Sequence, residues 1–188
     1  MAYRNGTYIA FHANGTTDPT ASDIKFYNLM KAWTNKTDDD FSFINSHDKT
    51  SAVRDGSKRA TLRSRLVTRL NNSKHLVLIL GKTTKDDTDW VPFEIEHAID
   101  KCKLPVIVVY ASSIYDTDYA VRDPKKLSHY WPKSLKQRIE NGSVNAIHIP
   151  FKKAPLIDAI GQFDVKKQPS GGGYGIYSEA ANSSFGLK

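Results

Sequence analysis

Short apolar runs alternate along this chain with segments whose apolar residues recur at helical spacing, and this alternation constrains the fold most. The run at residues 75–80 is continuously apolar after His75, which predicts a strand buried on both faces, as in a parallel sheet. The segment before it, residues 56–71, sets Leu62, Leu66 and Leu70 on one helical stripe. Because such a strand needs a helix layer on each side, the chain is predicted to form an α/β fold.

The same patterns place five strands and the helices between them. Strands are predicted at residues 8–12, 41–45, 75–80, 104–110 and 145–149. Helices are predicted at residues 23–33, 56–71, 89–102 and 154–163, with Ser22 and Asp89 as the caps of the first and third. Ligands of parallel sheets bind at the carboxyl ends of the strands, so the residues just after each strand are the first candidates for a site.

Two segments fall outside this plan. Residues 112–143 are longer than a simple crossover and carry one predicted helix near 132–141; a lid, an interaction surface and a packing insert are all compatible with them. Residues 166–188 contain the run Ser-Gly-Gly-Gly-Tyr-Gly, which is typical of a flexible tail. The predicted organisation is one domain at residues 1–165, with the insert at 112–143, followed by a glycine-rich tail at 166–188.

Composition and hydropathy exclude several classes of protein. The longest apolar stretches, residues 76–80 and 104–111, are too short to cross a bilayer, and the first residues have no apolar signal-peptide core. The single cysteine, Cys102, excludes disulfide frameworks and cysteine-based zinc sites. We therefore expect a cytoplasmic protein without a membrane partner.

The net charge of +7 is concentrated in one stretch of the sequence. Residues 54–69 carry six basic side chains and one acidic one. A basic helix face is most often solvated, and contact with a nucleotide or a nucleic acid is the alternative. Since no nucleic-acid-binding motif accompanies the stretch, no specific nucleic-acid partner is expected.

Motifs for binding phosphate or metal are incomplete. Gly81-Lys-Thr-Thr84 resembles the end of a P-loop, but such a loop needs a glycine where Leu76 stands, inside a predicted strand. No G-x-G-x-x-G sequence follows the first strand, which leaves a Rossmann dinucleotide site unsupported. Glu94 and His97 have a spacing that can bind a metal on a helix face. Because no further ligands accompany this pair, a structural role is favoured and no metal is expected.

The sequence Asp89-Trp-Val-Pro-Phe-Glu-Ile95, at the start of the predicted third helix, resembles a motif of TIR domains. Two other features agree in order and position. The first strand ends in Ala10-Phe-His-Ala13, and Gly81-Lys-Thr-Thr84 stands where TIR domains carry a polar loop. Over residues 5–163 the chain is most similar to the TIR-like (ThsB-type) proteins of bacterial Thoeris anti-phage defence. The resemblance implies a flavodoxin-like TIR fold, with a five-stranded parallel sheet and helices on both faces.

The activity that the resemblance implies is cleavage of NAD⁺ between nicotinamide and ribose, with NAD⁺ as substrate rather than cofactor. Similar Thoeris members make a cyclic ADP-ribose-type second messenger that activates a separate effector protein. Bond cleavage builds positive charge on the ribose, which a fixed carboxylate stabilises. Glu94 is the candidate catalytic carboxylate. Glu96 competes for this role, and the two glutamates cannot both face one pocket because they lie two residues apart on a helix.

The resemblance also suggests which residues border the substrate. Trp90 lies one turn before Glu94 and could offer an aromatic face to the nicotinamide or the ribose. The other expected substrate contacts are Phe11, His12, Asn14, Ser46, Asp48 and Thr84. Arg54 or Lys58 would meet the pyrophosphate.

Two other functions stay open at this point. A non-catalytic TIR-like adaptor would act by self-association, with Glu94 turned to solvent or paired structurally. A nucleoside deoxyribosyltransferase-like enzyme would need a second carboxylate near Glu94, for which Asp48 and Asp89 are the candidates. For the first function the product stays open between hydrolysis and cyclisation, and a homo-oligomer is compatible with enzyme and adaptor alike.

Overall fold

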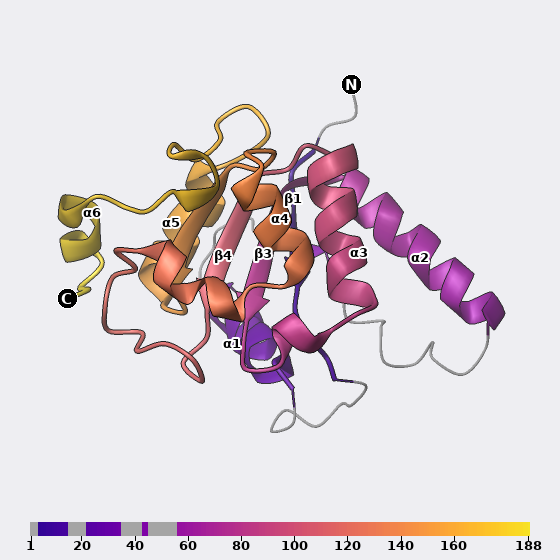
Figure 1. The fold of residues 1–188 in the computed structure, drawn as a ribbon, viewed down its shortest axis with the longest axis horizontal. Coiled ribbons are helices and arrows are strands. Elements are labelled where there is room, and N and C mark those ends of the chain that lie inside the picture. Colours follow the sequence, from indigo (N-terminus) through magenta and orange to yellow (C-terminus); the bar gives the residue numbers. More distant parts are fainter. Residues whose placement is uncertain (1–3, 15–21, 35–42, 45–55) are drawn as a thin grey trace.

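The computed structural model describes residues 4–14, 22–34, 43–44 and 56–188, the side chains of 34, 43–44 and 56–58 excepted. A five-stranded parallel sheet in the order β2-β1-β3-β4-β5 forms its centre, with helices on both faces, which confirms the predicted fold class (Figure 1). The strands are β1 (Gly6–Ala10), β2 (Phe43–Ile44), β3 (Ser73–Leu80), β4 (Val106–Tyr110) and β5 (Ala146–Pro150). Each overlaps its predicted range, although β1 begins and ends two residues earlier than predicted.

Five of the helices among the described residues follow the predicted order, and the sixth lies in the tail, where no helix was predicted. These helices are α1 (Ile24–Thr34), α2 (Gly56–Asn71), α3 (Trp90–Glu96), α4 (Lys133–Glu140), α5 (Lys153–Gln162) and, in the tail, α6 (Glu179–Ser184). A π-helical turn, His97–Lys101, continues α3 and completes the segment predicted as one helix. Within the described ranges, no helix combines the length and the apolar character needed to cross a bilayer.

Side chains at alternate positions along the strands pack into two hydrophobic cores, one on each side of the sheet. In β3, Leu76, Leu78 and Leu80 point to the first core, while Val77 and Ile79 point to the second, and all five are fully buried. Helices α2, α3 and α4 close the first core, and α1 and α5 close the second. Figure 1 shows α3 and α4 in front of the strands. Burial on both faces explains why β3 is continuously apolar.

The strand order creates a topological switch point between β1 and β3. From β1 the chain moves outward to β2 and then crosses back to β3, so the connections leave in opposite directions there. Tyr8 on β1 lies beside Leu76 on β3. In open sheets of this order, ligands bind outside the carboxyl ends of the strands at the switch point. The residues that follow β1 and β3 therefore meet at the edge where a site is expected.

The segment 112–143 is only partly an insert. Its predicted helix is α4, which carries Leu135 and Ile139 into the first core and forms the crossover from β4 to β5. The interpretation of the whole segment as lying outside the basic plan is therefore wrong. The additional part is the post-β4 insert (residues 112–130), which includes the 3₁₀ helix η4 (Pro124–Tyr130).

The glycine-rich tail packs on the domain, so its predicted flexibility is wrong. The backbone N–H of Gly175 donates to Ala146 O at 3.0 Å, and its carbonyl accepts from His148 N at 2.9 Å. These bonds add the tail to the outer edge of β5. Further along, the N–H of Lys188 donates to Asp118 O at 2.8 Å. The tail thus ties β5 to the post-β4 insert, while its boundary at residue 165 stays a prediction.

Candidate active site

Helix α3 places one of its two glutamates in the protein interior. The helix begins at Trp90, soon after the carboxyl end of β3, and Val91 and Ile95 anchor it in the first core. Glu94 lies on this buried side and has no exposed surface, whereas Glu96 is exposed. As the helical spacing predicts, the two do not share one environment, and Glu94 is the carboxylate that faces β1.

Glu94 is hydrogen-bonded to a tyrosine of the adjoining strand. The Tyr8 hydroxyl donates to Glu94 Oε1 at 2.6 Å, and both side chains are fully buried. Burial raises the pKa of the Tyr8 phenol well above its usual range, and the charge of Glu94 raises it further. Tyr8 therefore stays protonated at neutral pH and acts as the donor. Such a bond offsets part of the free-energy cost of burying a carboxylate.

Arginines of α2 cover aromatic side chains of α3. The Arg59 guanidinium lies 5.6 Å from the centre of the Trp90 ring, and that of Arg63 lies 4.2 Å from the centre of the Phe93 ring. Arg59 Nη2 also donates to Asp89 Oδ1 at 2.5 Å. Trp90 is half-buried, so part of its ring remains accessible at this edge of the sheet, with a cation beside it.

The start of α3 is capped by a residue other than the one predicted. Asp89 makes no capping hydrogen bond with its side chain. Instead, Asp87 Oδ1 accepts from the backbone N–H of Asp89 at 2.8 Å and of Trp90 at 3.0 Å. The prediction was wrong because Arg59 draws the Asp89 carboxylate away from the helix end. Because Asp89 is paired with Arg59, this arrangement does not favour Asp89 as the second carboxylate that a deoxyribosyltransferase-like enzyme would need beside Glu94.

A buried hydroxyl holds the polar loop after β3. Thr84 is fully buried, and its hydroxyl accepts from Gly81 N at 2.7 Å and donates to Asp23 Oδ2 at 2.9 Å. Burial raises the pKa of the Asp23 carboxyl, while the hydrogen bond from Thr84 lowers it. These contacts give Thr84 a structural role. Contact between Thr84 and a substrate stays a prediction, and it requires this buried arrangement to open.

The hydroxyl nearer the surface belongs to the neighbouring threonine. Thr83 Oγ1 lies 3.0 Å from His12 Nδ1, and both side chains are half-buried. This contact joins the segment after β1 to the loop after β3, which is the edge where the switch point places a ligand. His12 and Thr83 thus lie together at this edge, and contact of His12 with a substrate stays a prediction.

The remaining predicted substrate contacts are less closely connected to Glu94. Phe11 is buried in the second core, where its ring stacks on Tyr27 with 5.2 Å between centres, on the face of the sheet opposite α3. Asn14 is exposed and has a φ of 50°. Predicted residues outside the described side chains are Ser46, Asp48, Arg54 and Lys58.

Two buried polar residues of this region, Tyr8 and Asp23, were not predicted as site residues. The sequence does hold a signal for Tyr8, because it precedes Ala10 by two positions and so shares the strand face that α3 covers. The signal for Asp23 is weaker, since an aspartate beside a helix start is most often a solvated cap.

Among the described residues, Glu94 and His97 have separate hydrogen-bond partners and join no larger ligand cluster. Glu94 bonds to Tyr8, whereas His97 Nε2 lies 3.4 Å from Asn71 Oδ1. Over the described part of the chain, no three histidine, cysteine, aspartate or glutamate side chains gather closely enough to hold a metal ion.

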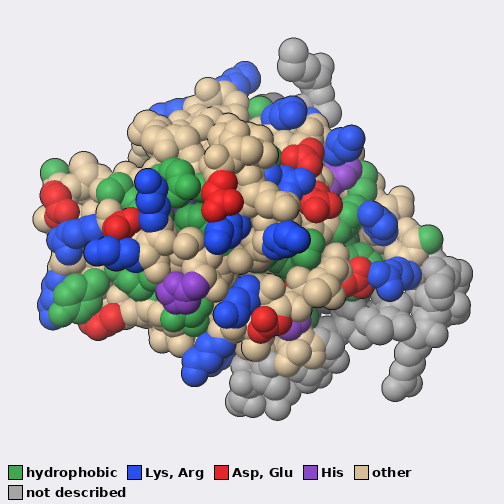
Figure 2. Space-filling view, in the orientation of Figure 1, with side chains coloured by type: hydrophobic (Ala, Val, Ile, Leu, Met, Phe, Trp, Pro, Cys, Tyr) green, Lys and Arg blue, Asp and Glu red, His purple; other side chains and the backbone are tan. Residues whose placement is uncertain are grey.

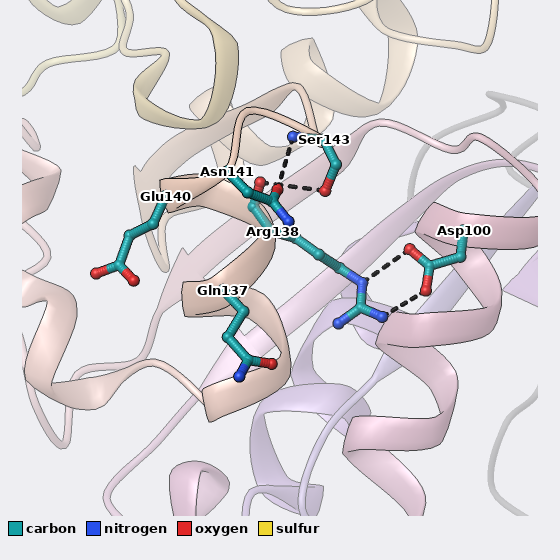
Figure 3. Close-up of a pocket in the computed structure, with 6 residues that line it drawn as sticks. All are labelled: Asp100, Gln137, Arg138, Glu140, Asn141 and Ser143. Carbon is teal, nitrogen blue, oxygen red and sulfur yellow. Dashed lines mark hydrogen bonds and ion pairs between the residues drawn. The ribbon is translucent and has the colours of Figure 1, made fainter.

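A hollow of about 710 Å³ lies away from this region, between the end of α4 and the π-helical turn after α3 (Figure 3). Arg138 forms one wall, and its Nε donates to Asp100 Oδ1 at 2.9 Å. The other residues that line the hollow are Gln137, Glu140, Asn141 and Ser143. Both helical segments end where β4 and β5 begin, so the hollow lies at the amino edge of the sheet, opposite the start of α3.

Basic side chains are scattered over the face shown in Figure 2, with acidic side chains among them. Among the described residues, Arg138 pairs with Asp100, Arg122 with Glu179 and Lys152 with Asp118. A polyanion-binding surface needs a continuous field of unpaired positive charge, and the acidic side chains in this view interrupt such a field.

A family model matches the region that carries these residues. The family is described as Thoeris protein ThsB, TIR-like domain, and the match covers residues 8–116, more than half of the 188-residue chain. The matched part runs from β1 through β4 and includes Tyr8, the polar loop after β3, and α3 with Glu94.

Proposed function

This chain belongs to the family of Thoeris ThsB TIR-like domains, and from that membership we propose that it cleaves NAD⁺ to make a nucleotide signal for a separate defence effector. The observation that carries the proposal is the position of Glu94. Helix α3 begins at the carboxyl edge of β3 and sets this carboxylate beside β1, with its Oε1 hydrogen-bonded to Tyr8. A fixed carboxylate near the switch point is the group that cleavage of an N-glycosidic bond requires.

In the proposed reaction, the bond between ribose C1′ and the nicotinamide nitrogen breaks, and the electron pair leaves with nicotinamide. The leaving group is neutral, so no general acid has to protonate it. The ribose becomes an oxocarbenium ion, and the Glu94 carboxylate stabilises its positive charge. Attack of water on C1′, with loss of a proton, gives ADP-ribose. Attack of an adenine nitrogen on C1′, also with loss of a proton, gives a cyclic product.

Neighbouring residues supply binding groups for the rest of the dinucleotide. Trp90 offers part of its ring for stacking on the nicotinamide or the ribose, and Arg59 beside it can meet the pyrophosphate. His12 and Thr83 place polar atoms at the carboxyl ends of β1 and β3, where they can hydrogen-bond a ribose hydroxyl or the nicotinamide amide.

The burial of Glu94 has a consequence for the product. Glu94 has no exposed surface, so the ribose reaches it only after the groups around the carboxylate move apart. A site that opens for the substrate and closes over it excludes bulk water from C1′. Within this proposal, attack by adenine is therefore favoured over attack by water, and the cyclic product is expected.

The proposal is tested by product analysis. The full chain is incubated with NAD⁺, both purified at high concentration and in extracts of phage-infected cells that express it, and the nucleotides are separated and weighed by mass spectrometry. We expect free nicotinamide together with a product lighter than ADP-ribose by one water. ADP-ribose in its place would keep the enzyme class and reject cyclisation. Intact NAD⁺ under both conditions would reject the proposal.

A non-catalytic adaptor is the second candidate, and the full burial of Glu94 against Tyr8 favours it. In that function the pair is a structural contact between α3 and β1, and signalling follows from self-association. Sedimentation velocity over a concentration series tests this candidate, which predicts growing assemblies and intact NAD⁺. A chain that cleaves NAD⁺ while it remains monomeric would reject the adaptor.

A further inference from the structure

We infer that Tyr8 is a positioning residue that orients the Glu94 carboxylate towards the positive charge that develops on the ribose, an inference that rests on the proposed function. The contact is direct, since the Tyr8 hydroxyl donates to Glu94 Oε1 at 2.6 Å. Both side chains have no exposed surface, so water does not compete for this bond in the closed structure.

Tyr8 lies on an inner strand of the sheet. β1 pairs with β3 on one side and with β2 on the other, and Tyr8 lies in both registers, beside Leu76 and Ile44. Its ring belongs to the first core, between the sheet and the helices that cover it. A phenol has two side-chain torsions, and packing on this scale fixes both, so the hydroxyl has one available position.

Glu94 is held less firmly by its own covalent structure. Val91 and Ile95 anchor α3 in the first core and fix where the Glu94 backbone lies. The glutamate side chain has three torsions, one more than tyrosine, and the last of them has a broad energy profile. The bond from Tyr8 restricts this last torsion at Oε1 and so helps to set the plane of the carboxylate relative to β1. Orientation of this kind determines how well a negative group stabilises charge that develops on a ribose.

The bond also supports the charge that the reaction needs. A neutral donor that hydrogen-bonds to a carboxylate favours its ionised form. Tyr8 keeps its proton, because burial and the charge of Glu94 both disfavour its phenolate. Tyr8 therefore remains a neutral donor, and its hydrogen bond favours the negative charge on Glu94 that stabilises an oxocarbenium ion.

The matched control is Tyr110, a second fully buried tyrosine on a central strand of the same sheet. Its hydroxyl accepts from Trp131 Nε1 at 2.8 Å and lies 2.9 Å from His148 Nδ1. Tyr110→Phe and Tyr8→Phe thus each delete a buried, hydrogen-bonded hydroxyl from the first core, but only Tyr8→Phe deletes a bond to Glu94. Any general effect of losing a buried hydroxyl appears in both variants.

The experiment compares nicotinamide release from NAD⁺ by the wild-type chain, Tyr8→Phe, Tyr110→Phe, Glu94→Gln and the Tyr8→Phe/Glu94→Gln double variant. For Tyr8→Phe we expect kcat to fall about 10- to 100-fold, the range for a hydrogen bond to a charged group, with KM little changed. For Tyr110→Phe we expect kcat to be unchanged although the chain is less stable. In the double variant, Tyr8→Phe should add nothing to the loss caused by Glu94→Gln, because Tyr8 acts through that carboxylate.

The outcomes separate this inference from the function on which it rests. If the wild-type chain releases no nicotinamide, the proposed function and the inference both fall. If the wild-type chain is active, Glu94→Gln is inactive and Tyr8→Phe keeps its kcat, the inference alone is overturned. An equal loss of kcat in Tyr8→Phe and Tyr110→Phe also overturns it, since the effect would then be general. Thermal unfolding of each variant establishes that folded protein is compared.

Discussion

Gly81 lies against the carboxylate of Asp23, and this contact decides which residue position 81 can hold. A Cβ atom at this position would lie 1.8 Å from Asp23 Oδ1. Asp23 is 5% exposed and accepts a hydrogen bond from Thr84, so it cannot turn outward without leaving that hydroxyl unpaired. The requirement for glycine here comes from space and not from a positive φ.

The Gly81→Ala variant should therefore be less stable by about 2–3 kcal/mol, from overpacking and the disturbed hydrogen bond. Gly161 is the matched control, because it lies in α5 with open space around its Cα position. Gly161→Ala should be neutral or more stable by up to about 1 kcal/mol, since alanine favours a helix. Urea unfolding measures both. Equal free energies of unfolding for the two variants would contradict the role assigned to Asp23.

At the residue scale, sequence reasoning separates side chains only where a periodic element carries them. Helical spacing distinguishes Glu94 from Glu96, because two residues on a helix face different sides. Strand alternation would likewise have set Phe11 on the face opposite Tyr8. A loop has no such period, so the sequence could not tell that Thr84 is buried while its neighbour carries the accessible hydroxyl.

At the element scale, the glycine-rich tail is held by close packing. A Cβ atom at Gly175 would lie 2.5 Å from both Ala146 O and Ser170 O, and one at Gly173 would lie 2.8 Å from Ile139 Cγ2. Glycine here lets the backbone approach β5 and α4 closely. Composition alone could not predict this, because a glycine run serves equally for flexibility and for close approach.

The Gly175→Ala variant should release the tail from β5. We expect it to lower the free energy of unfolding by about 1–3 kcal/mol and to expose the tail to proteases. Gly172 is the control, since it has a φ of 61° and open space around it. Gly172→Asn should be tolerated, because asparagine adopts positive φ more readily than other residues. Limited proteolysis of the two variants decides; a tail cleaved equally in both would contradict the packing account.

Element positions were largely predictable because the apolar periods change sharply along this chain. Buried parallel strands and amphipathic helices leave patterns with periods that do not overlap. The error concerned α4, whose place as a crossover helix depends on tertiary packing of Leu135 and Ile139 against the first core. The long post-β4 insert separates α4 from β4 in the sequence, so the sequence did not indicate that α4 connects β4 to β5.

At the scale of the whole molecule, two buried histidines connect stability to pH. His75 Nδ1 donates to Phe163 O at 2.7 Å, and His148 Nε2 donates to Gly173 O at 2.9 Å, so each ring has a defined neutral tautomer. Burial lowers the pKa of both histidines to about 4. Each joins distant parts of the chain, and protonation of either ring places a charge in the interior.

The free energy of unfolding should therefore fall as the pH drops. A histidine that is neutral when folded takes up a proton on unfolding between its ordinary pKa of about 6.5 and its folded pKa. Each neutral histidine therefore contributes fully to the free energy of unfolding above pH 6.5. This free energy falls by about 3 kcal/mol for each ring as the pH drops towards 4. Asp23, whose pKa is raised, acts in the opposite direction over part of this range. Urea unfolding at pH 7.5, 6 and 5 would contradict this account if the stability did not change.

The central claim concerns the whole molecule acting as an enzyme through one carboxylate, and nicotinamide release from NAD⁺ tests it most directly. The assay compares the wild-type chain with Glu94→Gln and with Glu96→Gln, its exposed neighbour on the same helix. We predict release by the wild type and by Glu96→Gln, and a loss of at least about 100-fold in Glu94→Gln. Equal rates for Glu94→Gln and the wild type would contradict the account.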